Sequence, residues 1–325
     1  MSRPIPPADA AYYLPLEPAT DGAERFASTE HTVGPWSEVM QHMSPPSALL
    51  VRALQRCDPR PSTRLTRVTV EVLGAVPRAE LTVRTHVSRP GRQVEMLIAE
   101  LSAVASSGAE RVVVRASAWR MATVDTAQVV VRTEATLASR DGGKQHELPP
   151  IWVPGYVDTI EWSWLDGFLD APGIGIAWGH PRVQVVSGEH PTALESLFAV
   201  VDSANGIGSP LDVREWTFLN TDLSVHLYRE PVGAWTGVAA STDVGPDGVG
   251  LCSAVLHDEL GPVGRSAQIL LVRPRPSRSG SQAAGTDVRG KDGLDPQRCQ
   301  VVHHGVDVLA VDHRPHRHPV LVGHR

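Results

Sequence analysis

The sequence predicts an α+β fold built from two similar halves. Each half contains one long helix-like segment, and a series of segments with the alternating polarity of antiparallel strands follows it. The order of these elements repeats along the chain, although the residue identities do not. Such a repeat is the pattern of a duplicated unit in which one helix packs on one antiparallel sheet.

The first half begins with a helix that is expected to start near Pro45. Proline fits the first turn of a helix, and Leu49, Leu50, Ala53 and Leu54 then follow at helical spacing. The strand-like segments of this half are Arg64–Val72, Ala79–Val87, Arg92–Val104 and Arg111–Met121. We therefore assign residues 1–125 to an N-terminal domain.

The second half repeats this order, with a helix expected at Pro191–Ser203. The strand-like segments after this helix are Glu215–Tyr228, Trp235–Thr242, Gly250–Asp258 and Gly264–Arg273. A further strand-like run, Tyr156–Trp164, precedes the helix, so the second domain is expected to span residues 151–276. The polar residues 126–150 between the halves are predicted to be a linker.

Composition limits the kinds of protein that this chain can be. At 325 residues, with 42% hydrophobic and 20% charged residues, it is typical of a globular protein with cores that need no disulfide bonds. The net charge of −6 and the lack of a basic region argue against a nucleic-acid partner. No run approaches the roughly 18 apolar residues of a membrane span. Three widely spaced cysteines and the absence of a signal-peptide pattern favour a cytoplasmic location.

The tail, residues 277–325, differs in composition from the rest of the chain. It is rich in Gly, Ser, Arg, Asp and His without any periodicity, so it is predicted to be disordered, and a change of reading frame near residue 277 would give the same pattern. Six of the 14 histidines lie there. They could ligate a metal ion, but the interleaved arginines and prolines favour simple compositional bias. We expect neither a metal nor a cofactor.

Three polar side chains interrupt segments that should otherwise face a core. Asp202 lies late in the second helix, Asn220 on the first strand after it, and Gln268 on the last strand. A carboxylate and two amides can hold one water molecule and accept its proton, so a hydrolytic site is the leading interpretation. Asn220 and Asp222 have the same parity on one strand and should share a face, whereas Thr221 should point the other way.

Each of these residues also has a purely structural interpretation. Asp202 could cap the end of its helix, Asn220 could be satisfied by backbone groups, and Gln268 is a site candidate only if the other two lie nearby. The sequence contains no nucleophile elbow, no phosphate-binding loop, no zinc-protease motif and no dinucleotide fingerprint followed by an acidic residue. No other chemistry is therefore indicated more clearly than water activation.

Several segments resemble the acyl-CoA thioesterase II-like family of the thioesterase-like superfamily. They are HMSPPSALLVRAL, SRPGRQVEM, FAVVDSANGIG, FLNTDLSVHLYREPVGAW and GPDGVGLCSAVLHDELGPVGRSAQILLVRP, and the resemblance covers about residues 20–275. It implies a double hotdog fold, in which two long helices are each wrapped by an antiparallel sheet and the sheets pair into one layer. It also implies hydrolysis of fatty acyl-CoA to free acid and CoA without a covalent enzyme intermediate.

The resemblance also implies roles for individual residues. The family's catalytic Asp falls on Asp202 and its Gln on Gln268. The third position, Thr or Ser in the best-known members, falls on Asn220, with Thr221 adjacent, which is a departure from the family pattern. Water would attack the thioester carbonyl while Asp202 accepts the proton, Asn220 and Gln268 hold the water, and backbone N–H groups stabilise the oxyanion. His42 could contact the pocket or could be a loop histidine.

Two other functions remain open on the same fold. The chain could bind acyl-CoA without hydrolysing it, an alternative that the asparagine in the third site position favours. It could also be a hydratase, although no Asp/His pair is evident beside Asp202. In either case acyl-CoA is the expected small-molecule partner, and association into a homo-oligomer is expected because free sheet edges are a liability.

Overall fold

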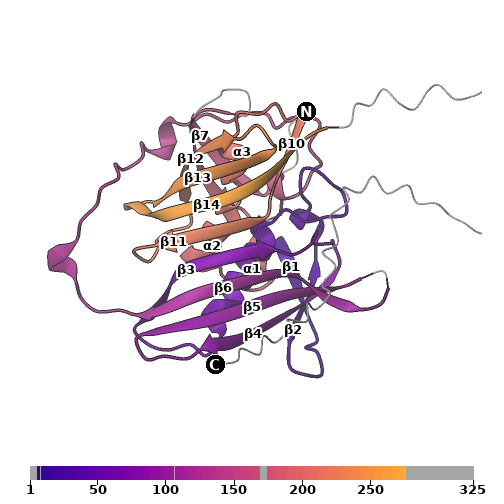
Figure 1. Ribbon diagram of the computed structural model, residues 1–325, viewed down its shortest axis with the longest axis vertical. Coiled ribbons are helices and arrows are strands. Elements are labelled where there is room, and N and C mark those ends of the chain that lie inside the picture. Colours follow the sequence, from indigo (N-terminus) through magenta and orange to yellow (C-terminus); the bar gives the residue numbers. More distant parts are fainter. Residues whose placement is uncertain (1–5, 8, 106, 169–173, 276–325) are drawn as a thin grey trace, which may run out of the picture. The chain divides into compact units, whose positions relative to one another are not determined.

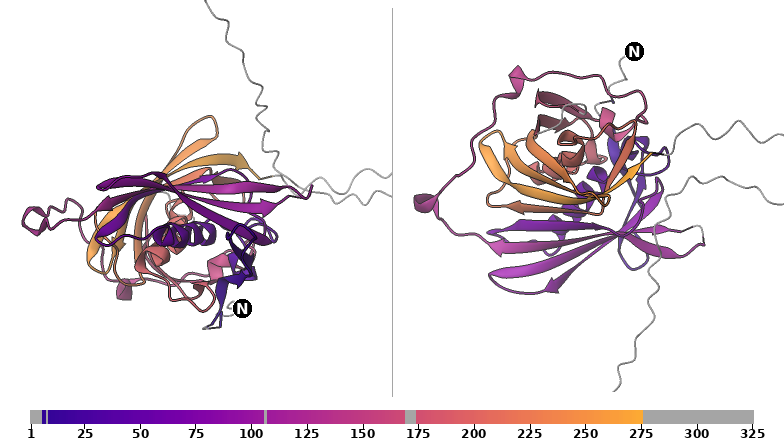
Figure 2. Two further views of the ribbon diagram at one scale, coloured as in Figure 1. Left: turned by 90° about the horizontal axis from the view of Figure 1, so that it is seen from below. Right: turned by 45° about the horizontal axis from the view of Figure 1, so that its top comes forward.

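The computed structural model describes residues 6–7, 9–105, 107–168 and 174–275, which form one compact unit. A single 14-stranded sheet dominates this described part, and it curves around the helices (Figures 1 and 2). The helices are α1 (Ser44–Arg56), α2 (Ala193–Val201) and the short α3 (Ala204–Ile207). The predicted α+β class, with few helices and a large sheet, is confirmed at this level.

The strands follow one another across the sheet in the order β7-β8-β12-β13-β14-β11-β3-β6-β5-β4-β2-β1-β9, and β10 pairs separately with β14. Those of the first half are β1 (Ala11–Leu16), β2 (Glu24–Ser28), β3 (Thr63–Val72), β4 (Glu80–Arg89), β5 (Val94–Val104) and β6 (Glu110–Ala122). Those of the second half are β7 (Ile160–Asp166), β8 (Gly175–Pro181), β9 (Gln184–Val186), β10 (Trp216–Asn220), β11 (Asp222–Leu227), β12 (Thr236–Val244), β13 (Val249–Asp258) and β14 (Gly261–Pro274).

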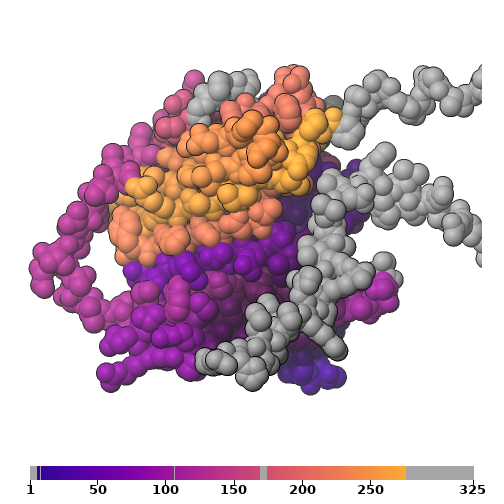
Figure 3. Space-filling view, in the orientation of Figure 1, coloured from indigo at the N-terminus to yellow at the C-terminus, as the bar shows by residue number. Residues whose placement is uncertain are grey.

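The two halves are joined at two places in this sheet. Strand β3 pairs antiparallel with β11, so that Glu71 lies opposite Asp222, and β1 pairs parallel with β9. In the space-filling view the first-half strands (purple) and second-half strands (orange) lie side by side (Figure 3). Helices α1 and α2 pack against each other beneath the sheet. The halves therefore share one core, and the predicted boundaries between domains and linker stay predictions.

Helix α1 begins at Ser44, close to the expected start, and its apolar residues are fully buried. Several elements were not predicted: β1, β2, β8 and β9 lie in segments without a clear alternating pattern. Helix α2 ends at Val201, and Asp202 and Ser203 form a turn before α3. No helix among the described residues is long and apolar enough to cross a membrane. The tail that was predicted to be disordered lies outside the described residues.

The expected single strand Glu215–Tyr228 is instead two strands, β10 and β11, with a bulge between them. Asn220 lies opposite Leu270 and Ser224 lies opposite Ala267, so four steps along this strand match three along β14. A bulge of this kind reverses the facing of the residues that follow it. Phe218 and Asn220 therefore face inward together with Leu223, while Asp222 faces outward with Ser224 and His226. The sequence interpretation that put Asn220 and Asp222 on one face is wrong for this reason.

Glycine allows the turn after α2 to lie directly on the sheet. A Cβ atom on Gly208 would lie 2.7 Å from the carbonyl oxygen of Ala240 on β12, and one on Gly175 would lie 1.8 Å from that of Ile207. Neither distance is tolerable for a side-chain carbon, so only glycine permits these approaches. The close packing of α3 on β8 and β12 fixes the position of Asp202 immediately before it.

Candidate active site

The structure brings Asp202, Asn220 and Gln268 together under the sheet. The Oδ1 atom of Asp202 accepts hydrogen bonds from Asn220 Nδ2 at 2.7 Å and from Gln268 Nε2 at 3.1 Å. Asp202 is only 2% exposed. The three side chains come from the end of α2, the end of β10 and the middle of β14. A carboxylate and two amides from separate elements therefore form one cluster.

The environment of Asp202 changes its basicity. Burial raises the pKa of its carboxyl group to about 7, and the hydrogen bonds from Asn220 and Gln268 act in the opposite direction. No basic side chain among the described residues forms an ion pair with it, apart from the contact with His42 considered below. A carboxyl group that titrates near neutrality can both take and release a proton at physiological pH, as a general base must.

Gln268 is buried, at 1% exposed, and its amide is used on one side only. Its Nε2 donates to both the carboxylate and the backbone carbonyl of Asp202, each at 3.1 Å. Its Oε1 has no hydrogen-bond partner among the described residues. A buried acceptor without a partner costs free energy, so this oxygen is suited to accept a hydrogen bond from a water or hydroxyl bound beside Asp202.

Thr221 does not belong to this cluster. Its side chain is exposed at the bulge, and its hydroxyl donates over 3.4 Å to Asp222 Oδ1 and to the carbonyl of Ile269. Asp222 Oδ1 also accepts the N–H of Ile269 at 3.0 Å. These bonds stabilise the bulge that turns Asn220 inward, so the residue facing Asp202 offers an amide and not a hydroxyl.

His42 and Tyr156 complete the surroundings of Asp202. His42 Nδ1 lies 3.5 Å from Asp202 Oδ2, and its ring stacks on Tyr156 with 4.0 Å between centroids. The Tyr156 hydroxyl donates to the carbonyl of Ala199 at 2.8 Å and is 2.8 Å from Ser203 Oγ. Burial lowers the pKa of His42 to about 3, so the imidazole is neutral at physiological pH. Sequence reasoning left His42 undecided and missed Tyr156, whose only signal was its place in an aromatic-rich run.

Cys252 lies on β13 directly opposite Gln268. Burial raises the pKa of its thiol to about 11, so the sulfur stays protonated and is a poor nucleophile. In the part of the chain that the structure describes, no group of three or more His, Cys, Asp or Glu side chains is placed to hold a metal ion. The polar contacts of Asp202 in this cluster are therefore those with its two amide donors and with His42.

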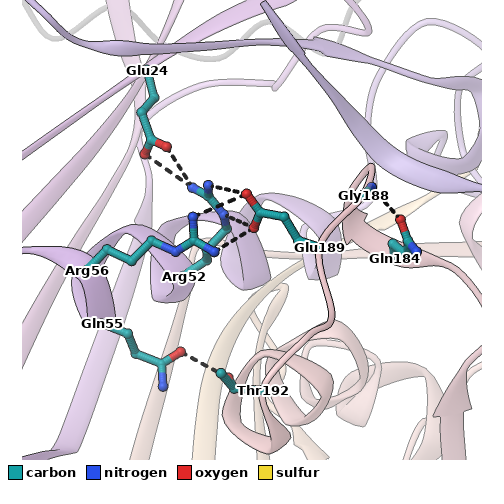
Figure 4. A network of polar contacts seen from close by, with 8 residues as sticks. All are labelled: Glu24, Arg52, Gln55, Arg56, Gln184, Gly188, Glu189 and Thr192. Carbon is teal, nitrogen blue, oxygen red and sulfur yellow. Dashed lines mark hydrogen bonds and ion pairs between the residues drawn. The ribbon is translucent and has the colours of Figure 1, made fainter.

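Helices α1 and α2 form a pair with Asp202 at one end, and the opposite end of this pair has a different polar network (Figure 4). Because α1 and α2 are antiparallel, the end of α1 lies beside the start of α2, and the hydroxyl of Thr192 donates to Gln55 Oε1 at 3.0 Å. Arg52 forms a two-bond pair with Glu189, both bonds at 2.7 Å, and also contacts Glu24. Arg56 binds the same Glu189 carboxylate.

Comparison with known proteins identifies the family. Residues 132–272 match the model for the acyl-CoA thioesterase C-terminal domain, and residues 32–121 match the model for the acyl-CoA thioesterase N-terminal domain. The chain belongs to the acyl-CoA thioesterase II-like family. The resemblance inferred from the sequence is thus confirmed. No curated protein matches this member of the family.

Solved structures agree with this family in fold. A hotdog-fold protein from Alicyclobacillus acidocaldarius superposes with a TM-score of 0.64 at 12% identity, covering 83% of this chain and 98% of that one. A candidate thioesterase II from Thermobifida fusca gives 0.59 at 15% identity, covering 83% and 99%. An acyl-CoA thioesterase II from Mycobacterium marinum gives 0.52 at 14% identity, covering 82% and 97%. This family member therefore has a hotdog fold.

Proposed function

We propose that this protein is an acyl-CoA thioesterase that cleaves fatty acyl-CoA by direct attack of water, within a double hotdog in which the two sheets pair through β3 and β11. The observation that carries the proposal is the buried Asp202 carboxyl group, held by two amide donors and titrating near neutrality. The protein's membership of a family of acyl-CoA thioesterases supports the choice of substrate.

The mechanism follows from the position of each polar atom. Water binds beside Asp202 and gives a proton to its carboxylate while the water oxygen forms a bond to the thioester carbonyl carbon. Gln268 Oε1, which has no partner among the described residues, accepts the other hydrogen of the water. The carbon–sulfur bond then breaks, and the departing CoA thiolate takes the proton from Asp202. The products are a free acid and CoA, and the carboxylate is regenerated.

A second candidate is a non-catalytic acyl-CoA-binding protein. Two observations favour it: the residue facing Asp202 is Asn220 and not the Thr or Ser of the best-known family members, and Asp202 is 2% exposed. The proposed hydrolase requires the thioester to reach this buried carboxylate. A binding protein requires only that acyl-CoA be held, with no activated water.

The test is the release of free thiol from acyl-CoA substrates of graded chain length. Wild-type protein should release thiol, with a rate that depends on chain length, and Asp202→Asn should not. Asp212→Asn is the matched control, because that carboxylate is on the surface and pairs with Arg214. Binding of acyl-CoA without thiol release by the wild type would overturn the hydrolase and support the binding protein.

Location and assembly form a further part of this proposal. We infer a cytoplasmic homo-oligomer, because the cysteine pattern suits a reducing compartment and the sheet is open, ending at β7 and β9 in the described chain. Light scattering on the purified protein would measure the oligomeric state directly, and a monomer at micromolar concentration would contradict it.

A further inference from the structure

The start of helix α1 lies beside the Asp202 cluster, and the residues Ser44–Ser47 offer no free backbone donor there. The first four N–H groups of a helix normally lack partners within the helix and can stabilise an anion. In α1 these positions are the N-cap Met43 and the first helical residues Ser44, Pro45 and Pro46. The two prolines have no N–H group. Ser44 donates to His42 Nδ1 at 3.1 Å, and Ser47 donates to the carbonyl of Met43 at 3.0 Å.

The hydrogen bond from Ser44 determines which nitrogen of His42 carries the proton. Nδ1 accepts this bond and so holds a lone pair, and in a neutral imidazole the proton is then on Nε2. Burial keeps the ring neutral by lowering the pKa of His42 to about 3. A neutral imidazole of this tautomer is a hydrogen-bond donor at Nε2 and nowhere else.

The orientation of this donor is fixed by the surrounding residues. The ring stacks on Tyr156 at an interplanar angle of 13°, and Tyr156 is in turn held by the carbonyl of Ala199 and by Ser203, next to Asp202 in the chain. The His42 side chain is 15% exposed, and within the described chain its ring is hydrogen-bonded at Nδ1, to the N–H of Ser44. Its Nδ1 is 3.5 Å from Asp202 Oδ2, so the imidazole ring that carries Nε2 borders the carboxylate.

We propose that the Nε2–H of His42 donates a hydrogen bond to the carbonyl oxygen of the thioester and stabilises the oxyanion that forms when water attacks. This inference rests on the proposed thioesterase activity. As the water oxygen bonds to the carbonyl carbon, the π electron pair moves to the oxygen facing Nε2, and the water proton goes to Asp202. The pair then returns, the carbon–sulfur bond breaks, and His42 keeps its proton throughout.

A neutral donor suits this position better than a charged one. Protonated His42 would form an ion pair with Asp202 at their 3.5 Å contact, and an adjacent positive charge lowers the pKa of a carboxyl group and weakens it as a base. Tyr156, the other titratable group in contact with the ring, is neutral as well, since burial raises its pKa. The neutral imidazole therefore stabilises the oxyanion without weakening the base.

Two substitutions of His42 separate donation from packing. His42→Ala removes the donor, and kcat should fall about 10²–10³-fold, as after loss of an oxyanion donor, with a much smaller change in KM. His42→Gln places an amide N–H near the former Nε2 and should recover at least about tenfold of that loss. The matched control is His180→Ala, a histidine that also stacks on an aromatic ring, Trp235, and contacts a backbone carbonyl outside the site. It should retain wild-type kcat.

Circular dichroism and thermal unfolding must show that each variant is folded, and His42→Gln alone decides the matter if His42→Ala does not fold. Two results would overturn this inference while leaving the thioesterase intact. One is a folded His42→Ala protein with the wild-type kcat. The other is a folded His42→Gln protein that is no faster than a folded His42→Ala protein. A wild-type protein that hydrolyses no acyl-CoA would instead overturn the proposed function, and this inference with it.

Discussion

The two ends of the antiparallel helix pair place carboxylates in opposite electrostatic settings. At one end Asp202 receives hydrogen bonds from two neutral amides, and burial raises the pKa of its carboxyl group to about 7. At the other end Glu189 is bound by the guanidinium groups of Arg52 and Arg56, and these hydrogen bonds lower the pKa of its carboxyl group (Figure 4). The difference lies in burial and in the partners: the Asp202 side chain is 2% exposed with only amide donors, whereas that of Glu189 is 27% exposed and is bound by arginines.

This contrast shows how the two ends of one helix pair can hold carboxyl groups of different basicity. Pairing with a guanidinium favours the ionised carboxylate and removes its tendency to take a proton, whereas amide donors leave much of that tendency in place. The Arg52 side chain is 3% exposed, so its charge requires compensation, and Glu189 and Glu24 supply it. The Arg52 end thus joins α1 to Glu24 and Glu189, while the carboxyl group at the Asp202 end keeps its capacity to take a proton near neutral pH.

The largest effect is expected when each of the two carboxylates is replaced by its neutral amide. Asp202→Asn should lower kcat for thioester hydrolysis about 10²–10⁴-fold, because the general base is lost. Glu189→Gln should leave the kcat of the folded protein close to the wild-type value, because that carboxylate is already neutralised by arginines. Steady-state thiol release measures both, and a comparable loss of kcat in a folded Glu189→Gln protein would break the comparison.

The same two residues should differ in how they link folding to pH. The folded pKa of Asp202 lies above that of an unfolded Asp, so its contribution to stability is present below about pH 4 and is lost as the pH rises through about 7. A shift of this size corresponds to roughly 4 kcal/mol of unfolding free energy. Urea unfolding between pH 5 and 8 should show this decline in the wild type, and the Asp202→Asn variant should show a flatter profile.

Some of this site could be predicted from sequence because its residues break local patterns. Asp202 and Gln268 are polar residues in apolar segments, and such interruptions are visible without knowledge of the fold. The bulge at Thr221 could not be predicted, since it depends on the register of β10 and β11 against β14. The parallel pairing of β1 with β9 joins residues far apart in the chain, and no local pattern encodes it.

The role of the neighbours of Asp202 was hidden for the same reason. His42 precedes α1 by a short step, yet its partners Tyr156 and Asp202 are more than a hundred residues away. The two prolines after Ser44 were used only to locate the helix start. Their chemical consequence, the loss of backbone donors, becomes visible only when that helix start is placed beside a buried carboxylate.

A smaller effect is expected when the Arg52 end is broken. Arg52→Ala leaves Glu189 and Glu24 partly buried without their shared partner, and the unfolding free energy should fall by roughly 3 kcal/mol. Arg56 still pairs with Glu189, which keeps the loss at the lower end of the range for buried pairs. Arg56→Ala is the matched control: its side chain is 52% exposed, so its removal should cost less than about 1 kcal/mol. Urea unfolding measures both values, and equal losses would contradict a special role for Arg52.

The smallest effect sharpens the assignment of Asp202 as the titrating base. The hydrogen bond from Asn220 lowers the pKa of Asp202, so Asn220→Ala should raise it. Since the base acts in its ionised form, kcat/KM should rise with pH in a limb near 7 for the wild type, and this limb should move to higher pH in the variant. Asn220→Thr restores a hydroxyl donor and should shift the limb less than alanine does. A limb that stays in place in both variants would mean that a group other than Asp202 controls the rate.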